Sequence, residues 1–274
     1  MTIILDGPLG TELTRRGVAT TLPTWSAMAL QTAPHVVAAI HADYAAAGAT
    51  VHTANTFRTQ QRTIGADWQR WTNAAVQLAL GAVPADHLVF GSLAPLEDCY
   101  RPDRSPRYAG REHRAMAAAL SQAGCHGILC ETFPHVGEAT VATEAAVRTG
   151  LPVWVAFTAG PSGDLLTPQQ MAAGAKQVVS AGAAAVLVNC TPACQTLAYV
   201  EAIRDAVAEV PVGAYANAGS PEDAIGWEVS QAAGGLRYTS LAMQWRAAGA
   251  SLIGGCCGTG PAHIAALAEA FEQA

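Results

Sequence analysis

Eight short apolar segments recur along the 274-residue chain, each followed by a loop and a longer stretch of helical periodicity. This alternation favours a parallel sheet covered by helices, because parallel neighbouring strands need a crossover connection that a helix supplies. Eight is also the number of strands that closes such a sheet into a barrel. The sequence therefore predicts an α/β fold, a single (β/α)8 TIM barrel that occupies residues 1–274 as one domain.

The predicted strands lie near Ile3–Asp6, Thr50–Asn55, His87–Ala94, Gly127–Thr132, Val153–Thr158, Ala184–Cys190, Val212–Asn217 and Ser251–Cys256. The predicted helices are rich in alanine and span His35–Ala47, Gln69–Leu80, Arg111–Ala123, Val136–Arg148, Pro168–Ala181, Thr196–Val207, Ser240–Ala248 and Pro261–Phe271. Glycine is favoured just after a helix end, and the expected stops are Gly48, Gly124, Gly150, Gly182 and Gly249.

Composition excludes several classes of protein. The hydrophobic fraction of 51% and charged fraction of 13% indicate a compact globular chain. The net charge of -6 comes without a basic stripe, which argues against nucleic acid as a partner. No apolar run approaches the ~20 residues that span a bilayer, and the apolar start at Met1–Leu5 is too short for a signal peptide. Seven unevenly spaced cysteines then indicate thiols in a reducing cytoplasm.

Two adjacent cysteines, Cys256 and Cys257, end the last apolar segment between glycines on both sides. Consecutive side chains of a regular strand point to opposite faces, so both thiols can share one ion only if the backbone turns there. The flanking glycines permit that turn, and Pro261 suits the first position of a following helix. The stretch reads as strand, tight loop and helix, and it suggests a metal site.

A third thiol, Cys190, closes another apolar segment in the same way. Three thiolates from two strand ends, with a fourth position open, fit a catalytic zinc ion better than a closed structural one. A lone cysteine at a strand end is more often a small buried hydrophobic residue, so Cys190 is a candidate metal ligand only together with Cys256 and Cys257. Cys194, four residues further on, is a candidate substitute ligand.

Barrel enzymes carry their chemistry at the carboxyl ends of the strands. Apart from the thiols, the polar residues at the predicted strand ends are Asp6, Asn55, Ser92, Glu131, Thr158 and Asn217. A mouth lined by these side chains is what an active site needs.

With these positions in view, the chain resembles the homocysteine S-methyltransferase family, the zinc-dependent barrels that move a methyl group onto homocysteine. The matching stretches are Asp6–Leu13, Trp25–Ala27, His41–Tyr44, Thr53–Phe57, Cys130–Pro134, Val188–Thr191, Tyr215–Gly219 and Gly254–Thr259. They cover essentially the whole chain. The resemblance implies that Cys190, Cys256 and Cys257 ligate Zn²⁺, and that Asp6 and Glu131 hold the amino group of the amino-acid substrate.

Other roles for these residues stay open at this point. Asp6 could serve only as a turn residue before Gly7, and Glu131 could cap the next helix. Asn55 and Asn217 could contact substrate or only brace loops. Thr53, Thr56 and Ser92 are weaker candidates for substrate contacts.

The methyl donor is less constrained than the acceptor. Pro8 stands where the family usually has a glycine, and Leu96–Arg107 is unlike the donor-side pattern of S-methylmethionine users. That segment could be an ordered lid or a solvated connection. Aromatic faces attract cationic donors, and the candidates by location are Trp25, Phe57, Phe133 and Tyr215. S-Methylmethionine is the preferred donor, S-adenosylmethionine the second and a betaine-type compound the third.

The expected function is zinc-dependent methyl transfer from an onium donor to the thiolate of homocysteine, giving methionine. The expected partners are these small molecules, with the oligomeric state open. One alternative is a barrel subunit that works with a separate corrinoid or folate protein. Another is a non-catalytic zinc-thiolate protein, and selenohomocysteine or another small thiol remains an alternative acceptor.

Overall fold

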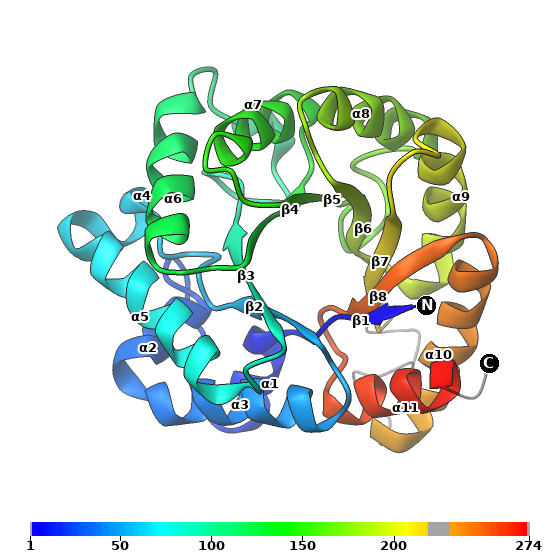
Figure 1. Ribbon diagram of the computed structural model, residues 1–274, viewed down its shortest axis with the longest axis horizontal. Coiled ribbons are helices and arrows are strands. Elements are labelled where there is room, and N and C mark those ends of the chain that lie inside the picture. The colour runs from blue at the N-terminus through cyan, green and yellow to red at the C-terminus, as the bar shows by residue number, and fades with distance from the viewer. Residues whose placement is uncertain (1, 219–230, 273–274) are drawn as a thin grey trace.

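The computed structural model describes residues 2–218 and 231–272. In these ranges eight parallel strands form a central barrel, and helices surround it (Figure 1). The strands are β1 (Ile3–Ile4), β2 (Val51–Ala54), β3 (Leu88–Leu93), β4 (Gly127–Phe133), β5 (Val153–Phe157), β6 (Ala185–Pro192), β7 (Val212–Asn217) and β8 (Ala250–Gly255). The α-helices are α1 (Leu9–Arg15), α2 (Ala29–Thr32), α3 (Pro34–Ala46), α4 (Gln61–Ile64), α5 (Trp68–Ala82), α6 (Gly110–Gln122), α7 (Val136–Val147), α8 (Pro168–Ser180), α9 (Thr196–Ala206), α10 (Gln231–Ala247) and α11 (Pro261–Glu272). Short 3₁₀ turns are η1 (Ser26–Met28), η2 (Gly65–Asp67), η3 (Pro102–Arg104) and η4 (Ala193–Gln195).

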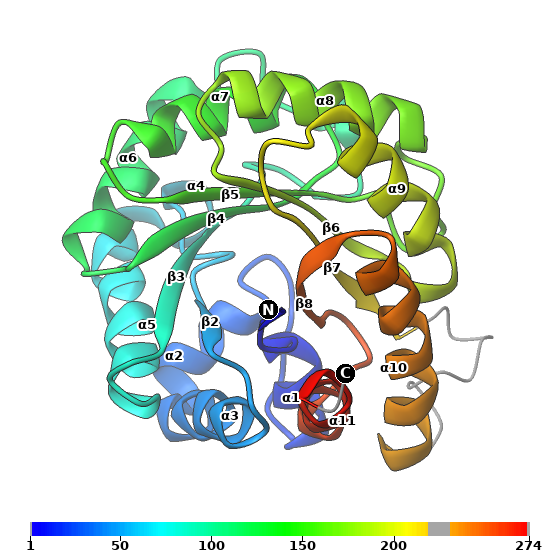
Figure 2. The ribbon, with the colours of Figure 1, turned by 45° about the vertical axis from the view of Figure 1, so that its right-hand side comes forward.

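The sheet runs in the order β1-β8-β7-β6-β5-β4-β3-β2, so each strand lies beside its sequence neighbour. Its two ends meet, because Leu5 and Val51 form a parallel bridge. The amide of Asp6 donates to the Val51 carbonyl at 3.0 Å, and the amide of Leu5 donates to the Ile253 carbonyl at 2.8 Å. The ring of strands seen in Figure 2 confirms the predicted (β/α)8 TIM barrel.

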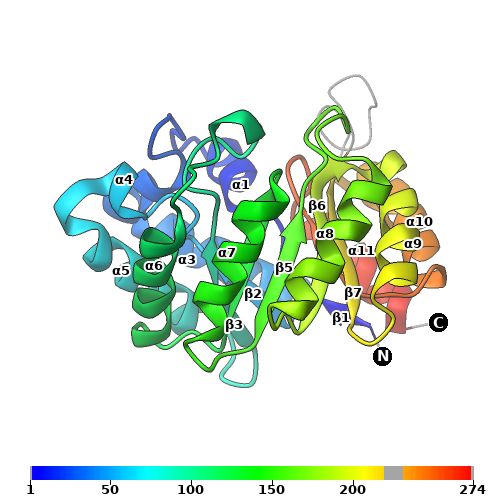
Figure 3. The same ribbon diagram turned by 90° about the horizontal axis from the view of Figure 1, so that it is seen from above.

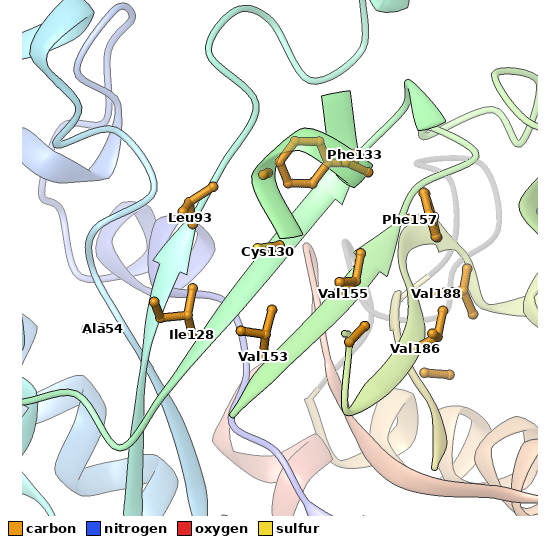
Figure 4. Close-up of a cluster of buried hydrophobic side chains, with 14 of the residues drawn as sticks. Ala54, Leu93, Ile128, Cys130, Phe133, Val153, Val155, Phe157, Val186 and Val188 are labelled. Carbon is orange, nitrogen blue, oxygen red and sulfur yellow. The ribbon is translucent and has the colours of Figure 1, made fainter. Parts of the chain in front are cut away.

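Both faces of the strands are buried, which explains why their sequences read as continuous apolar runs. In β6, Ala185 and Leu187 belong to the cluster inside the barrel, whereas Val186 and Val188 belong to the larger cluster under the helices. Figure 4 shows this outer cluster, where side chains such as Phe133, Val155 and Val188 extend from neighbouring strands. At ~25 cal/mol per Å² of apolar surface, burial of both layers is the main force that holds the barrel together.

The helix signals in the sequence are largely confirmed. All five glycines predicted as stops, Gly48, Gly124, Gly150, Gly182 and Gly249, have positive φ. Pro261 is the first residue of α11, as predicted. The short helices α1, α2 and α4 were not predicted. Helix α10 begins at Gln231 rather than near Ser240. Gly234 and Gly235 disfavour a helix by propensity, but Gly235 allows close packing, since a Cβ there would lie 3.2 Å from the Ala262 carbonyl of α11.

Because every strand runs in the same direction, all carboxyl ends open at one end of the barrel, the upper end in Figure 3. The N-terminus lies at the opposite end. In residues 2–218 and 231–272 no helix combines the length and apolar character needed to cross a membrane.

Candidate active site

Two irregular strand ends shape the centre of the barrel mouth. The registers of β4 and β6 shift after Cys130 and Asn189, and at these shifts Thr132 and Cys190 have φ values of 61° and 47°. Residues other than glycine rarely adopt this left-handed backbone conformation, which costs roughly 1–3 kcal/mol per residue. The Asn189 side-chain amide donates to the Thr132 hydroxyl at 2.8 Å, and Thr158 donates to the Cys190 carbonyl at 3.2 Å. Strain of this kind at strand ends re-aims side chains and marks a functional site.

The re-aimed Cys190 meets the cysteine pair at the end of β8. The Sγ atoms of Cys190, Cys256 and Cys257 all lie within 4.8 Å of one another, and Cys190 and Cys256 contact at 2.7 Å. The predicted turn is present and has Cys257 and Gly258 at its centre, because the Thr259 amide donates to the Cys256 carbonyl at 3.0 Å. The Cys256 amide donates to the Ala216 carbonyl at 2.9 Å, and the Thr259 hydroxyl donates to the Cys256 carbonyl at 2.8 Å.

The three thiols do not share protons equally. Contact with Cys256, and then with Cys257, raises the pKa of the Cys190 thiol. Contact with Cys190, and then with Cys256, lowers the pKa of the Cys257 thiol well below its ordinary value. Cys257 is also the most accessible of the three, since the other two are buried. The set offers soft sulfur ligands from two strand ends, the donor chemistry that suits Zn²⁺.

Glu131 is held in place beside this cluster. Its Oε1 accepts a hydrogen bond from the Ser92 hydroxyl, and its Oε2 accepts one from the Tyr215 hydroxyl at 3.0 Å. Burial raises the pKa of Glu131 above the ordinary value, while these two hydrogen bonds oppose the shift. The alternative that Glu131 caps the next helix is wrong, because His135 is the N-cap of α7.

Asp6 follows the end of β1 and lies at the barrel mouth. Its Oδ2 accepts the Thr53 amide at 2.8 Å, so Thr53 contributes its backbone here. Burial, opposed by the Thr53 amide and reinforced by the charge of Glu131, raises the pKa of Asp6. Asp6 and Glu131 are 6% and 9% exposed, and two such carboxyls near each other favour a cation between them.

The remaining predicted contacts divide into two groups. Asn55 braces a loop, because its side-chain amide donates to the Ser26 carbonyl at 2.9 Å and its Oδ1 accepts the Ser26 hydroxyl at 2.7 Å. Thr56 donates to the Ser92 carbonyl at 2.8 Å and is also structural. Asn217, by contrast, has a buried Oδ1 without a hydrogen-bond partner in the described residues. Gly219 of the matching stretch lies outside the described residues.

Tyr100 is a site residue that sequence reasoning missed. It packs, half-buried, against the cluster inside the barrel together with Cys257. The charge of Cys190, followed by burial, raises the pKa of the Tyr100 hydroxyl, so the phenol lies near the thiols. The only signal in the sequence was its position in Leu96–Arg107, the segment that departs from the family pattern.

The four aromatic candidates lie differently. Trp25 and Phe57 contact edge to face at 5.7 Å, and Arg58 lies over the Phe57 ring. Tyr215 reaches the site through Glu131. Phe133 is fully buried in the outer cluster, so it faces the helices rather than the mouth (Figure 4).

The segment from Leu96 to Arg107 is attached at both ends. The Leu96 amide donates to Glu138 Oε1 at 2.9 Å, and the Ser105 hydroxyl donates to Glu138 Oε2 at 2.6 Å. Arg62 forms ion pairs with Glu97 and Glu112. In the middle of the segment Cys99 is buried and Tyr100 half-buried, whereas Asp98, Arg101, Asp103 and Arg104 are exposed. It is therefore an ordered cover with a solvated outer surface, which combines the two alternatives left by the sequence.

Glu138→Gln is expected to loosen this cover and lower the free energy of unfolding by about 2–3 kcal/mol, the usual contribution of hydrogen bonds to a buried charge. Burial raises the pKa of Glu138, but hydrogen bonds from His113, Leu96 and Ser105 outweigh it and the net pKa is lowered. The stabilisation is therefore fully present at pH values above the ordinary pKa of a glutamate, and it is lost as the pH falls through the lowered pKa of Glu138 in the folded protein. Urea unfolding at several pH values tests this, with exposed Glu144→Gln on the same helix as control. Equal stability of the two variants would contradict it.

Comparisons with known proteins agree with this geometry. The family model for homocysteine S-methyltransferase matches residues 3–271. The chain is 31% identical to homocysteine S-methyltransferase 4 of Zea mays, over 99% of this chain and 90% of that protein. It is also 31% identical to the homocysteine S-methyltransferase of Escherichia coli K12, over 97% of this chain and 94% of that protein.

The solved structures lead to the same family. The metallated form of the homocysteine methyltransferase MmuM from Escherichia coli superimposes with a TM-score of 0.79 at 25% identity, covering 98% of this chain and 96% of MmuM. The barrel, its strand-end thiols and these matches together show that the chain belongs to the homocysteine S-methyltransferase family and is a methyltransferase.

Proposed function

We propose that this chain transfers a methyl group from an onium donor to the sulfur of homocysteine, with Zn²⁺ held by Cys190, Cys256 and Cys257. The observation that carries the proposal is the convergence of these three thiols at one point of the barrel mouth. The metallated MmuM structure supports a metal in the family. The three soft ligands support zinc as that metal, and they come from the ends of β6 and β8.

Asp6 and Glu131 would bind the ammonium group of homocysteine. Both carboxyls are buried at the mouth, and the charge of Cys257 contributes to the raised pKa of Glu131. An amino acid anchored there by its ammonium group can extend its sulfur toward the thiols. Ser92 and Tyr215 fix the Glu131 carboxylate by donating to its two oxygens, so the anchor is positioned before the substrate arrives. The buried Oδ1 of Asn217, which has no hydrogen-bond partner among residues 2–218 and 231–272, would accept a hydrogen bond from the same substrate.

Zinc supplies one property when bound, which is to hold the substrate sulfur as a thiolate at neutral pH. The sulfur of homocysteine then forms a bond to the donor methyl carbon as the bond from that carbon to the onium atom breaks. The electron pair of the broken bond stays on the donor, which leaves as a neutral sulfide or amine. No general acid is required, and the thiol proton of homocysteine goes to solvent. The chain's contribution is positioning and exclusion of water.

The donor would bind against Tyr100 under the cover formed by Leu96–Arg107. The Tyr100 ring lies near the thiols, where the cationic centre of a donor must approach the sulfur of homocysteine. Aromatic faces attract such cations by ~0.5–2 kcal/mol. S-Methylmethionine remains the preferred donor and S-adenosylmethionine the second.

Tyr100→Leu is expected to raise the KM for the donor by roughly 2- to 30-fold, the range that corresponds to a lost cation–π contact. Tyr100→Phe keeps the ring and should stay close to the unchanged protein. The KM for homocysteine and the zinc content should not change in either variant. Steady-state kinetics with both substrates provides the measurement, and equal donor KM values for the Leu and Phe variants would remove Tyr100 from the donor site.

The function itself is tested by methionine formation with purified, zinc-replete protein, homocysteine and each donor in turn. Turnover with a sulfonium or betaine donor alone supports the proposal and names the donor. Turnover only after a corrinoid or folate protein is added would replace it by the partner-dependent alternative. Stoichiometric zinc without turnover under any of these conditions would leave the non-catalytic zinc-thiolate alternative. Selenohomocysteine in the same assay tests the acceptor.

A further inference from the structure

A second group of potential metal ligands lies away from the cysteines. Asp6, His41 of α3 and His52 of β2 each offer one ligand atom, and these atoms all lie within 4.8 Å of one another. Both histidines are completely buried and Asp6 is 6% exposed. The function proposed above uses Asp6 and gives neither histidine a role.

His41 carries the clearest sign of a missing ligand. Neither its Nδ1 nor its Nε2 has a hydrogen-bond partner in the residues that the structure describes. A neutral imidazole has one N–H group and one lone pair, and a buried polar group without a partner costs ~1–3 kcal/mol. Such a side chain fits a site in which something polar or cationic binds.

His52 is prepared to use one ring nitrogen as a ligand. Its Nε2 lies 3.1 Å from Nδ1 of His87, and the two rings meet edge to edge, with centroids 5.3 Å apart and an interplanar angle of 10°. In the tautomer in which His52 Nε2–H donates to His87, the lone pair of His52 lies on Nδ1. That Nδ1 has no hydrogen-bond partner within the described residues. Histidines that bind metals are commonly oriented by such a bond from their other nitrogen.

The protonation states suit a cation. Burial lowers the pKa of His41 to about 4. Burial, followed by the charges of His41 and His87, lowers the pKa of His52 to about 3, and an interaction with the Ala49 backbone opposes this shift. Both imidazoles are therefore neutral at pH 7, which is the form that binds metal ions. Asp6 is buried without a cationic side chain among the causes of its pKa shift, so an ion there would stabilise its carboxylate.

We propose that Asp6, His41 and His52 form a second metal site, separate from the three cysteines, that takes a divalent transition-metal ion such as Zn²⁺ or Co²⁺. Two imidazoles and one carboxylate match the preferences of these ions, whereas Mg²⁺ and Ca²⁺ prefer oxygen ligands alone. The Thr53 amide already holds Oδ2 of Asp6 and fixes the carboxylate for this role.

The site shares Asp6 with the proposed substrate pocket, and this part of the inference rests on the proposed function. An ion bound to Asp6 opposes the ammonium group of homocysteine by charge. Metal at the second site and homocysteine at the first should therefore weaken each other's binding. Couplings of this kind usually amount to ~5- to 150-fold in affinity.

The direct test is a Co²⁺ titration of the metal-free full chain, followed by native mass spectrometry and absorption spectra. We expect two equivalents, the first with the sulfur-to-metal charge-transfer band of the cysteine site and the second without it. His41→Gln and His52→Gln should each bind one equivalent, with the charge-transfer band retained. His35→Gln, an exposed histidine on the same helix, is the matched control and should bind two.

Several outcomes would overturn the proposal. A wild-type protein that stops at one equivalent has no second site. A second equivalent that persists in both histidine variants belongs to the surface. If the histidine variants fail to fold by circular dichroism, Asp6→Asn retains both rings and must also lose the second equivalent. None of these readouts requires methyl transfer, so they are independent of whether the proposed function is correct.

A kinetic experiment tests the link to the substrate pocket. Zinc added beyond one equivalent should raise the homocysteine KM of the wild-type protein by about tenfold, within the usual range of couplings. The KM of His52→Gln should not respond. An equal response in both proteins would exclude competition through Asp6, even where the stoichiometry confirms the second site.

Discussion

Cys257→Ala is expected to remove zinc and abolish methionine formation. Cys257 is the most exposed of three sulfurs that lie within 4.8 Å of one another, and it has the lowered pKa. Two remaining thiols cannot complete the proposed site. Loss of groups that merely support a metal ligand costs about 10- to 100-fold in affinity or activity, so loss of the ligand itself should exceed about 100-fold. Metal analysis and the methionine assay, run on the same preparation, measure both effects.

Cys194→Ala is the matched control, since this exposed cysteine lies in η4, just past the end of β6. It should keep one zinc per cysteine site and normal turnover. If Cys194→Ala loses zinc while Cys257→Ala retains it, the ligand set is wrong. If Cys257→Ala loses zinc but still forms methionine, the thiols hold a structural ion, and the proposed activation of homocysteine fails.

Glu131→Gln is expected to raise the homocysteine KM by about 30-fold or more. Removing one partner of a buried, hydrogen-bonded charge pair costs about 2 kcal/mol at the low end, and 1.4 kcal/mol corresponds to a factor of ten. The amide also disturbs the hydrogen bonds from Ser92 and Tyr215. The donor KM and the zinc content should change little. Exposed Glu201→Gln on α9 serves as the control.

The same interaction predicts a pH dependence. Burial raises the pKa of Glu131 and of Asp6, so each carboxyl becomes protonated at a higher pH than an ordinary carboxyl would. A protonated acid no longer pairs with the substrate ammonium. The homocysteine KM should therefore rise as the pH falls toward and through these raised values, and less steeply in Glu131→Gln. A homocysteine KM that is independent of pH in the acidic range, or unaffected by Glu131→Gln, would rule out the carboxylate anchor.

Local sequence was sufficient for the architecture. Apolar segments alternate with alanine-rich helical stretches, and glycines stop the helices at Gly48, Gly124, Gly150, Gly182 and Gly249. Both signals act over a few residues, through burial on both strand faces and through the freedom of glycine at positive φ. The helix at Gln231–Ala247 was underestimated for the opposite reason. Gly235 is explained by packing against α11, a contact between elements that local propensity does not contain.

The candidate thiols and carboxylates could also be named from the sequence, because each ends a predicted strand and matches a family motif. The spatial relations among these residues could not be predicted from the sequence. The left-handed backbone at Thr132 and Cys190 depends on contacts between β4, β5 and β6. The sequence left open whether Asn55 contacts substrate or braces a loop, and only the structure shows its two hydrogen bonds to Ser26. Tyr100 lies in a segment that Leu96 and Ser105 attach to Glu138, a residue distant in the sequence.

By itself, then, the sequence determined the (β/α)8 barrel, the family and the candidate thiols and carboxylates. Periodicity and short motifs are local properties, so they can be recognised in the sequence without the structure. The tertiary structure alone decided which of those side chains face one another, which cover the mouth, and that His41 and His52 lie buried beside Asp6. Those three residues come from a strand end, a helix and the next strand, and only closure of the barrel between β1 and β2 brings them together.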